Sequence, residues 1–185
     1  MRRVIVTTLA ILLVIPTAMA QRGNKGQHSV ALRYGLNTPA EAAWAMGIEY
    51  NNYRKGGTID AEFMYGYSEG YYKEHRAAIH NYMLCGSYSH RLLQNYRRTL
   101  MVYAGAGAAI GYTQGNNGDR ELAPGISLKT TEELAYALVP SLRMDIFVAK
   151  NFGFTAKVQD LIFIHSDLMQ PHNTTITIGF KYLIK

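Results

Sequence analysis

The chain has 185 residues, enough for one domain with its own core, and a formal net charge of +6. The charge is mild and the basic residues cluster only in segment 90–98, which argues against a nucleic-acid-binding surface. The single cysteine, Cys85, excludes an intrachain disulfide. After Ala20 no apolar run reaches the roughly 18 residues of a spanning helix, which argues against a helical membrane protein.

The N-terminus has the three-part layout of a secretory signal peptide. Arg2 and Arg3 precede an apolar run over residues 4–15, Pro16 breaks the run, and Ala18-Met19-Ala20 forms a cleavage motif. We predict a signal peptide over residues 1–20, cleavage between Ala20 and Gln21, and export of a single domain over residues 21–185. The alternative is a retained N-terminal anchor.

Alternation of apolar and polar residues, the pattern typical of β-strands, recurs through the exported part of the chain. It is found in residues 28–35, 43–52, 59–67, 78–89, 99–114, 135–149, 152–159 and 174–184. Eight such segments predict an all-β fold, an antiparallel up-and-down β-barrel of about eight strands.

Three of these segments need comment. Segment 99–114 is uncharged and rich in glycine, but its glycines recur with period two and do not form the dinucleotide-binding fingerprint. Pro140 cannot donate a ladder hydrogen bond, so we expect a bulge or a strand start there.

After Gln159 the alternation of apolar and polar residues is disturbed, because Asp160 would lie on the apolar face and Leu161 on the polar one. Either the strand has left the membrane by Asp160 or a bulge shifts its register.

The connections alternate between short turns, at residues 54–57 and 149–151, and longer polar loops. This is how outer-membrane barrels are connected, although the link 90–98 is long for a turn. The longest loop, residues 115–133, is either a contact surface or an unstructured polar loop.

Alternation alone leaves open whether the apolar face points outward to lipid or inward, as in a soluble barrel or sandwich. The opposite face is rich in glycine and in charges of both signs, which suits a narrow interior. Several segments also exceed the roughly 9–11 residues with which a tilted strand crosses a bilayer. We therefore predict a barrel in the outer membrane of a Gram-negative-type bacterium, with a soluble periplasmic ligand-binding barrel as the alternative.

Tyrosine supplies 14 of the aromatic residues against one Trp, and its ring and hydroxyl suit the boundary between lipid and water. The predicted aromatic girdle, near the strand ends, is Tyr34, Trp44, Tyr50, Tyr65, Tyr67, Tyr88, Tyr112 and Tyr182. The predicted interior charge network is Arg33, Glu49, Asp60, Glu62, Arg143, Asp145 and Lys157. Such a network closes the interior as a salt-bridged plug or, alternatively, forms a weak ion pathway; we favour the plug because side chains fill an eight-stranded barrel.

No catalytic, cofactor or metal site is predicted, and no small-molecule substrate. The six histidines lack paired metal-ligand spacing; they are His28, His75, His80, His90, His165 and His172. Cys85 is expected to be an inward packing residue. A nucleophilic triad could be drawn from Ser87, His80 and Asp160, but a chain of this size offers many such triples.

The sequence resembles the TraO family of conjugative-transposon transfer proteins over nearly all of the mature chain. The resemblance is carried by three blocks: "GSYSHRLLQNYRRTLMVYAGAGAAIGY" (with Tyr88, Leu92-Leu93, Arg97, Gly105-Ala106 and Gly111-Tyr112), "FVAKNFGFTAKVQDLIF" and the closing "ITIGFKYLIK". Many outer-membrane barrels end on an aromatic residue, whereas this chain ends Tyr182-Leu183-Ile184-Lys185.

The resemblance implies an exported, outer-membrane-associated component of a conjugative DNA-transfer apparatus, with other apparatus proteins as partners. From the predicted barrel and the charge pattern we expect contact with outer-membrane lipids and no direct nucleic-acid binding. The alternative function is that of a general small outer-membrane barrel, for adhesion or envelope maintenance.

Overall fold

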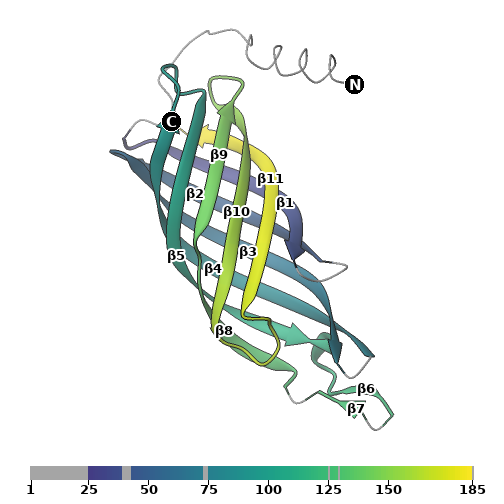
Figure 1. The fold of residues 1–185 in the computed structure, drawn as a ribbon. Helices are drawn as coiled ribbons and strands as arrows, with labels where there is room; N and C mark the ends of the chain where they lie inside the picture. The colour runs from purple at the N-terminus through teal and green to yellow at the C-terminus, as the bar shows by residue number, and fades with distance from the viewer. Residues whose placement is uncertain (1–24, 39–42, 73–74, 125, 129, 185) are drawn as a thin grey trace, which may run out of the picture.

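The computed structural model describes residues 25–38, 43–72, 75–124, 126–128 and 130–184, which form one β-barrel (Figure 1). The predicted signal peptide and its cleavage site, Ala20 and Gln21, lie outside these residues. The barrel strands are β1 (His28–Thr38), β2 (Trp44–Arg54), β3 (Gly57–Tyr72), β4 (His75–Gln94), β5 (Leu100–Gly115), β8 (Glu132–Leu138), β9 (Ser141–Phe147), β10 (Phe152–His165) and β11 (His172–Ile184). The loop after β5 contains a 3₁₀ turn, η1 (Asn116–Gly118), and a small hairpin of β6 (Glu121–Ala123) and β7 (Ile126–Ser127).

The strands form a closed antiparallel ring. Strands β1 to β5 pair in chain order, and β11 closes the ring by pairing with both β1 and β10. Strands β8 and β9 are two halves of one segment, because both lie between β5 and β10. The barrel therefore has eight segments around its circumference, as predicted. No helix in the described residues is long and apolar enough to span a membrane.

The apolar face of the sheet points outward. Leu32 and Phe180 are 58% and 56% exposed, whereas Arg33 and Lys181, their neighbours in sequence, are 1% and 0% exposed. A soluble barrel would bury the apolar side chains and expose the charged ones. The fold is thus the outer-membrane type, which confirms the predicted orientation of the alternating pattern.

Pro140 marks a strand start and not a bulge. Leu138 pairs with Ala108, and Ser141 pairs with Gly105, so the register against β5 is the same on both sides of the proline. The ladder is interrupted there because proline lacks a backbone N–H.

Strand β10 keeps its regular alternation of inward and outward side chains, although the sequence predicts that this alternation is disturbed after Gln159. It runs without a register change against β11 from Phe152 to Ile162, so Asp160 points outward and Leu161 inward, where Leu161 is buried. The pattern breaks in the sequence because the interior itself becomes apolar at this end. A bulge does occur in β10, but later, between Phe163 and His165.

The long link at residues 90–98 is mostly strand. β4 continues to Gln94, with a bulge between Arg91 and Leu93, and the turn to β5 is only residues 95–99. In this turn the side-chain Oδ1 of Asn95 accepts hydrogen bonds from the backbone N–H groups of Thr99 (2.7 Å) and Leu100 (3.1 Å). All connections on this side are therefore short.

We call this side, with the β2–β3, β4–β5 and β9–β10 turns, the turn end, and the opposite side the loop end. Both the start of β1 and the end of β11 lie at the turn end (Figure 1). In outer-membrane barrels the short turns face the periplasm and the longer loops face outward from the cell.

Candidate functional site

Side chains fill the barrel interior in three layers. An apolar layer lies at the loop end and consists of Ala45, Met64, Met83, Cys85, Ala109, Ala135, Ala137, Val139, Leu161, Phe163 and Met169. A second apolar layer lies at the turn end and consists of Tyr53, Met101, Tyr103, Phe147 and Leu183. Charged side chains occupy the section between them. Cys85 is thus a packing residue of the loop-end layer, as expected from the sequence.

Glu49 on β2 is the centre of the charged layer. Its carboxylate lies 2.6 Å from Arg33 Nη2, 2.7 Å from Arg143 Nη1 and 3.0 Å from Lys157 Nζ. Lys157 also reaches Glu62 at 2.8 Å, and Arg33 pairs with Glu62 as well. One carboxylate thereby connects strands β1, β9 and β10 across the interior.

Arg143 extends the same cluster toward the turn end. Its Nη1 lies 3.1 Å from Asp60 Oδ2, and its Nη2 donates to Thr58 Oγ1 at 2.8 Å. The guanidinium carbon lies 4.6 Å from the centre of the Tyr103 ring, a cation–π arrangement. Its Nε lies 3.5 Å from Asp145 Oδ2. The planar guanidinium therefore contacts several strands at once.

A further cation, Lys181, completes the cluster and was absent from the sequence-based set. Its Nζ lies 2.7 Å from Asp145 Oδ2, and both side chains have no exposed surface. Alternation places Lys181 on the inner face, and the registers of β9 and β11 against β10 bring it beside Asp145. We define the lumen charge network as Arg33, Glu49, Asp60, Glu62, Arg143, Asp145, Lys157 and Lys181.

The lumen charge network is electrically balanced and buried. It contains four cations and four carboxylates, and every side chain in it is at most 4% exposed. Neutral side chains satisfy the remaining carboxylate oxygens; Asn51 donates to Asp60 at 2.8 Å and Thr155 to Asp145 at 2.8 Å. Buried charges are tolerated only when they are paired and hydrogen-bonded in this way.

The eight predicted girdle residues all point outward and divide between the two barrel ends. Tyr34, Trp44, Tyr65, Tyr67 and Tyr112 lie toward the loop end, and Tyr50, Tyr88 and Tyr182 toward the turn end. The Trp44 ring lies 6.0 Å from that of Tyr34 and 5.3 Å from that of Tyr65. The prediction omitted Tyr82, which contacts Tyr65, and a cluster of Phe152, Phe154 and Phe180 at the turn end.

The loop over residues 115–133 is partly ordered by contacts of its own. Leu128 is buried, and its backbone N–H donates to the carbonyl of Arg120 at 2.8 Å. Glu133, at its end, accepts from the backbone N–H of Asp167 at 2.9 Å and so connects this loop to the one between β10 and β11.

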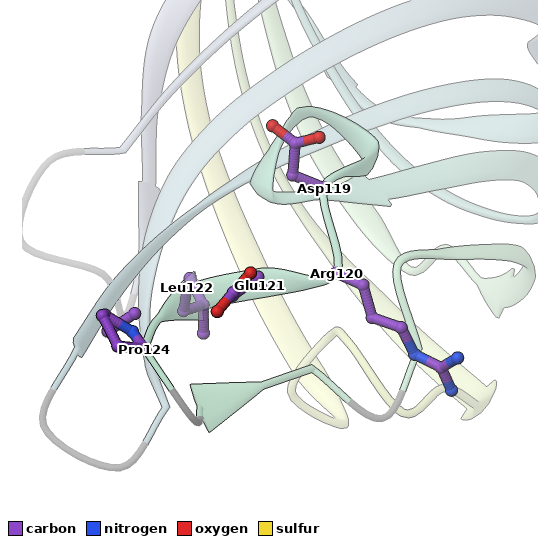
Figure 2. A pocket seen from close by; sticks show the side chains of 6 residues that line it. Asp119, Arg120, Glu121, Leu122 and Pro124 are labelled. Carbon is purple, nitrogen blue, oxygen red and sulfur yellow. The ribbon is translucent and has the colours of Figure 1, made fainter.

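Among the described residues, those that line a shallow hollow on this loop are 119–124, all from one stretch of chain (Figure 2). The side chains of Asp119 and Arg120 point in opposite directions (Figure 2). They do not converge on a common point, so the hollow lacks the geometry of a small-molecule site.

The triad drawn from the sequence is not assembled. Ser87 lies on the inner face of β4, His80 on the outer face of the same strand, and Asp160 on the outer face of β10, which is not adjacent to β4. Asp160 instead pairs with His172 Nδ1 at 2.8 Å. Within the described residues, no three His, Cys, Asp or Glu side chains meet as a metal site.

The family whose sequence model matches this chain, over residues 19–184, is described as conjugative transposon protein TraO. The chain belongs to the TraO family. A match of this extent spans every barrel strand, so the family assignment applies to the whole barrel and not to a fragment of it. Comparison of the sequence with curated proteins finds no match.

Solved structures similar to this TraO-family barrel are small outer-membrane proteins. Ail, the attachment invasion locus protein of Yersinia pestis, superposes with a TM-score of 0.59 and 13% identity over 87% of this chain and 100% of that one. Neisserial surface protein A gives a TM-score of 0.61 and 8% identity over 85% and 96%. OprG of Pseudomonas aeruginosa gives 0.56 and 13% over 89% and 99%. At these identities the likeness shows the fold alone.

Proposed function

We propose that this TraO-family barrel is a non-enzymatic structural and interaction component of a conjugative DNA-transfer apparatus at the outer membrane. The family match supports the conjugation context, and the outward apolar face supports the membrane location. Its partners are then outer-membrane lipids and other proteins of the apparatus. It uses no cofactor and does not bind DNA directly.

The observation that carries this proposal is the filled interior. The lumen charge network and the two apolar layers occupy the section through which a substrate would pass. An eight-stranded barrel has an interior just wide enough for side chains to fill, so it leaves no space for a DNA strand. The barrel therefore acts through its outer surfaces and its ends, as a plugged scaffold and not as a pore.

The loop end offers the more elaborate contact surface. The β6–β7 hairpin and η1 project there, and Asn117 Oδ1 of η1 lies 3.0 Å from His80 Nε2 on β4. Glu133, at the end of the same loop, accepts hydrogen bonds from the β10–β11 loop. An ordered, connected loop cluster presents a constant shape to a partner, which lowers the entropic cost of binding. We assign the contact with apparatus proteins to residues 116–124 of this cluster.

The test combines assembly and transfer. A donor strain that lacks the gene is complemented with the wild-type chain, or with a variant in which Arg120, Glu121 and Leu122 are each replaced by Ser. Outer membranes are compared on detergent gels before and after boiling, because a folded barrel migrates differently from the unfolded chain.

The proposal expects both chains to show the heat-dependent shift and only the wild type to restore transfer frequency. A control replaces Gln170, an exposed residue of the β10–β11 loop outside residues 116–124, with Ser and should transfer normally. If deletion of the gene leaves transfer unchanged but weakens the envelope, the chain is a general outer-membrane barrel. If the protein is periplasmic and lacks the heat shift, it is a soluble barrel.

A further inference from the structure

The two ends of the barrel carry opposite charge. The described residues of the turn end include the basic side chains Lys25, Arg54, Lys55, Arg91, Arg97, Arg98 and Lys150. Over the same described positions, 25–27, 54–56, 91–99 and 148–151, none is acidic. We call these seven residues the basic collar.

The loop end shows the reverse balance. The acidic residues described there are Glu69, Asp119, Glu121, Glu132, Glu133, Asp160 and Asp167, and the basic residues are Arg76 and Arg120. Because the lumen charge network is neutral, the uncompensated positive charge of the described chain lies at the turn end.

The basic collar also surrounds the barrel. It draws on the approach to β1 and on the β2–β3, β4–β5 and β9–β10 turns, so every described connection at this end contributes. Arg54, Lys55, Arg97 and Lys150 are exposed. A docking site for one globular partner would be concentrated on one side, whereas a ring fits a partner that surrounds the barrel.

The spacing between the basic residues and the aromatic residues indicates the depth of the basic collar in the membrane. Arg54 follows Tyr50 by four positions, and Lys150 precedes Phe152 by two. Along a strand tilted by about 45°, these spacings correspond to roughly 5–9 Å along the membrane normal. The headgroup region on each side of the hydrocarbon is about 5–8 Å thick. If the aromatic residues lie at the hydrocarbon boundary, the collar lies among the lipid phosphates.

We propose that the basic collar binds the phosphate groups of anionic phospholipids in the leaflet at the turn end. Arg and Lys near a membrane surface are attracted to anionic lipid, and guanidinium groups match phosphate geometry. The exposed Leu92 and Leu93, which follow Arg91 on β4, add apolar contact with the same leaflet. This inference rests on the membrane placement in the proposed function but not on a role in conjugation.

The experiment places the full exported chain in nanodiscs of phosphatidylcholine containing one third phosphatidylglycerol, and counts retained lipids by native mass spectrometry. The test variant is Arg54→Gln/Lys55→Gln/Arg97→Gln/Lys150→Gln. The matched control is Arg76→Gln/Arg120→Gln at the loop end, which also removes exposed basic residues. A gel with unheated and boiled samples in phosphatidylcholine alone checks that each chain is a folded barrel.

The wild type and the control should retain phosphatidylglycerol over phosphatidylcholine. In the test variant this preference should fall at least tenfold, because each basic side chain near an anionic surface strengthens lipid binding about fivefold. Raising salt should weaken the wild-type preference, a readout that needs no variant. Equal preference in wild type and test variant overturns the proposal. A variant that keeps its lipids but loses crosslinks to an acidic periplasmic protein in cells overturns it in favour of protein docking. Absence of the heat shift for all chains rejects the membrane barrel itself.

Discussion

Arg143 Nη1 and Glu49 Oε1 lie 2.7 Å apart, although the two residues are 94 positions apart in the chain. Arg143 comes from β9 and Glu49 from β2, strands that are not neighbours in the sheet. The contact therefore crosses the interior and forms only when the ring has closed. Long-range pairs of this kind favour the closed barrel over other arrangements of the same strands, because a buried charge without its partner carries a large desolvation cost.

Replacement of Glu49 by Gln should destabilise the barrel by about 3–5 kcal/mol, the cost of breaking a buried ion pair by removing one partner. Glutamine keeps the shape of the side chain but leaves Arg33, Arg143 and Lys157 with less compensating charge. The measurement is urea unfolding in lipid vesicles, followed by tryptophan fluorescence. Glu132→Gln, an exposed carboxylate at the loop end, is the control and should change little. Equal midpoints for the two variants would contradict a structural role for Glu49.

The pair Lys181 and Asp145 should show positive coupling in a double-mutant cycle. Lys181→Met leaves an excess carboxylate in the interior, and Asp145→Asn leaves an excess cation, whereas the double variant is balanced. We expect the double variant to be more stable than the sum of the single effects predicts, by about 1–3 kcal/mol. Strict additivity in the same unfolding assay would show that the two charges do not interact.

Gly107 and Gly86 are a matched pair of glycines on adjacent strands. A Cβ at Gly107 would lie 2.2 Å from the carbonyl oxygen of Gly86 and 2.5 Å from Ser87 Cβ, whereas a Cβ at Gly86 meets nothing within 4 Å. We expect Gly107→Ala to destabilise the barrel by about 1–3 kcal/mol through overpacking, and Gly86→Ala to be neutral or slightly stabilising. Thermal unfolding of the folded band on gels compares them directly. A neutral Gly107→Ala would mean that β4 and β5 can separate there without cost.

The strands and their orientation were predictable because alternation survives in every segment. Val30, Leu32 and Tyr34 on one face of β1, with Arg33 on the other, are enough to place this strand. In a membrane barrel the apolar side chains face outward to lipid and the charged ones face inward, the reverse of a soluble protein. The glycine-rich, charged face of the strands indicates this reversed arrangement.

The parts that sequence reasoning missed depend on strand register and on the composition of the interior at each end. Lys181 has no local signal that links it to Asp145, since their contact depends on the registers of β9 and β11 against β10. Leu161 was read as a disturbed phase because an apolar residue on the inner face looks like a register shift. The full length of β4 is not predictable from the pattern, because Arg91 to Gln94 form the exposed end of a hairpin and carry no alternation of apolar and polar residues.

The protein should not conduct ions in a planar lipid bilayer. Two apolar layers bracket the lumen charge network, so a continuous file of water would need both to open. Even the balanced variant Glu49→Ala/Arg143→Ala, which enlarges the central layer, should stay closed. Current recordings with an open porin as reference test this. Steady conductance steps from the wild type would favour the ion pathway over the plug.

Trp44, the only tryptophan, reports the depth of the loop-end aromatic residues. It points outward beside Tyr34, Tyr65 and Tyr67, and indole rings favour the headgroup level of a bilayer. We expect lipids labelled with a nitroxide near the headgroup to quench Trp44 fluorescence more than lipids labelled deep in the acyl chain. As a control, a Trp44→Phe/Leu32→Trp variant moves the probe toward the middle of β1, where the deep label should quench better. Stronger quenching of Trp44 by the deep label would place the loop-end ring inside the hydrocarbon and shift the predicted membrane boundary toward the loops.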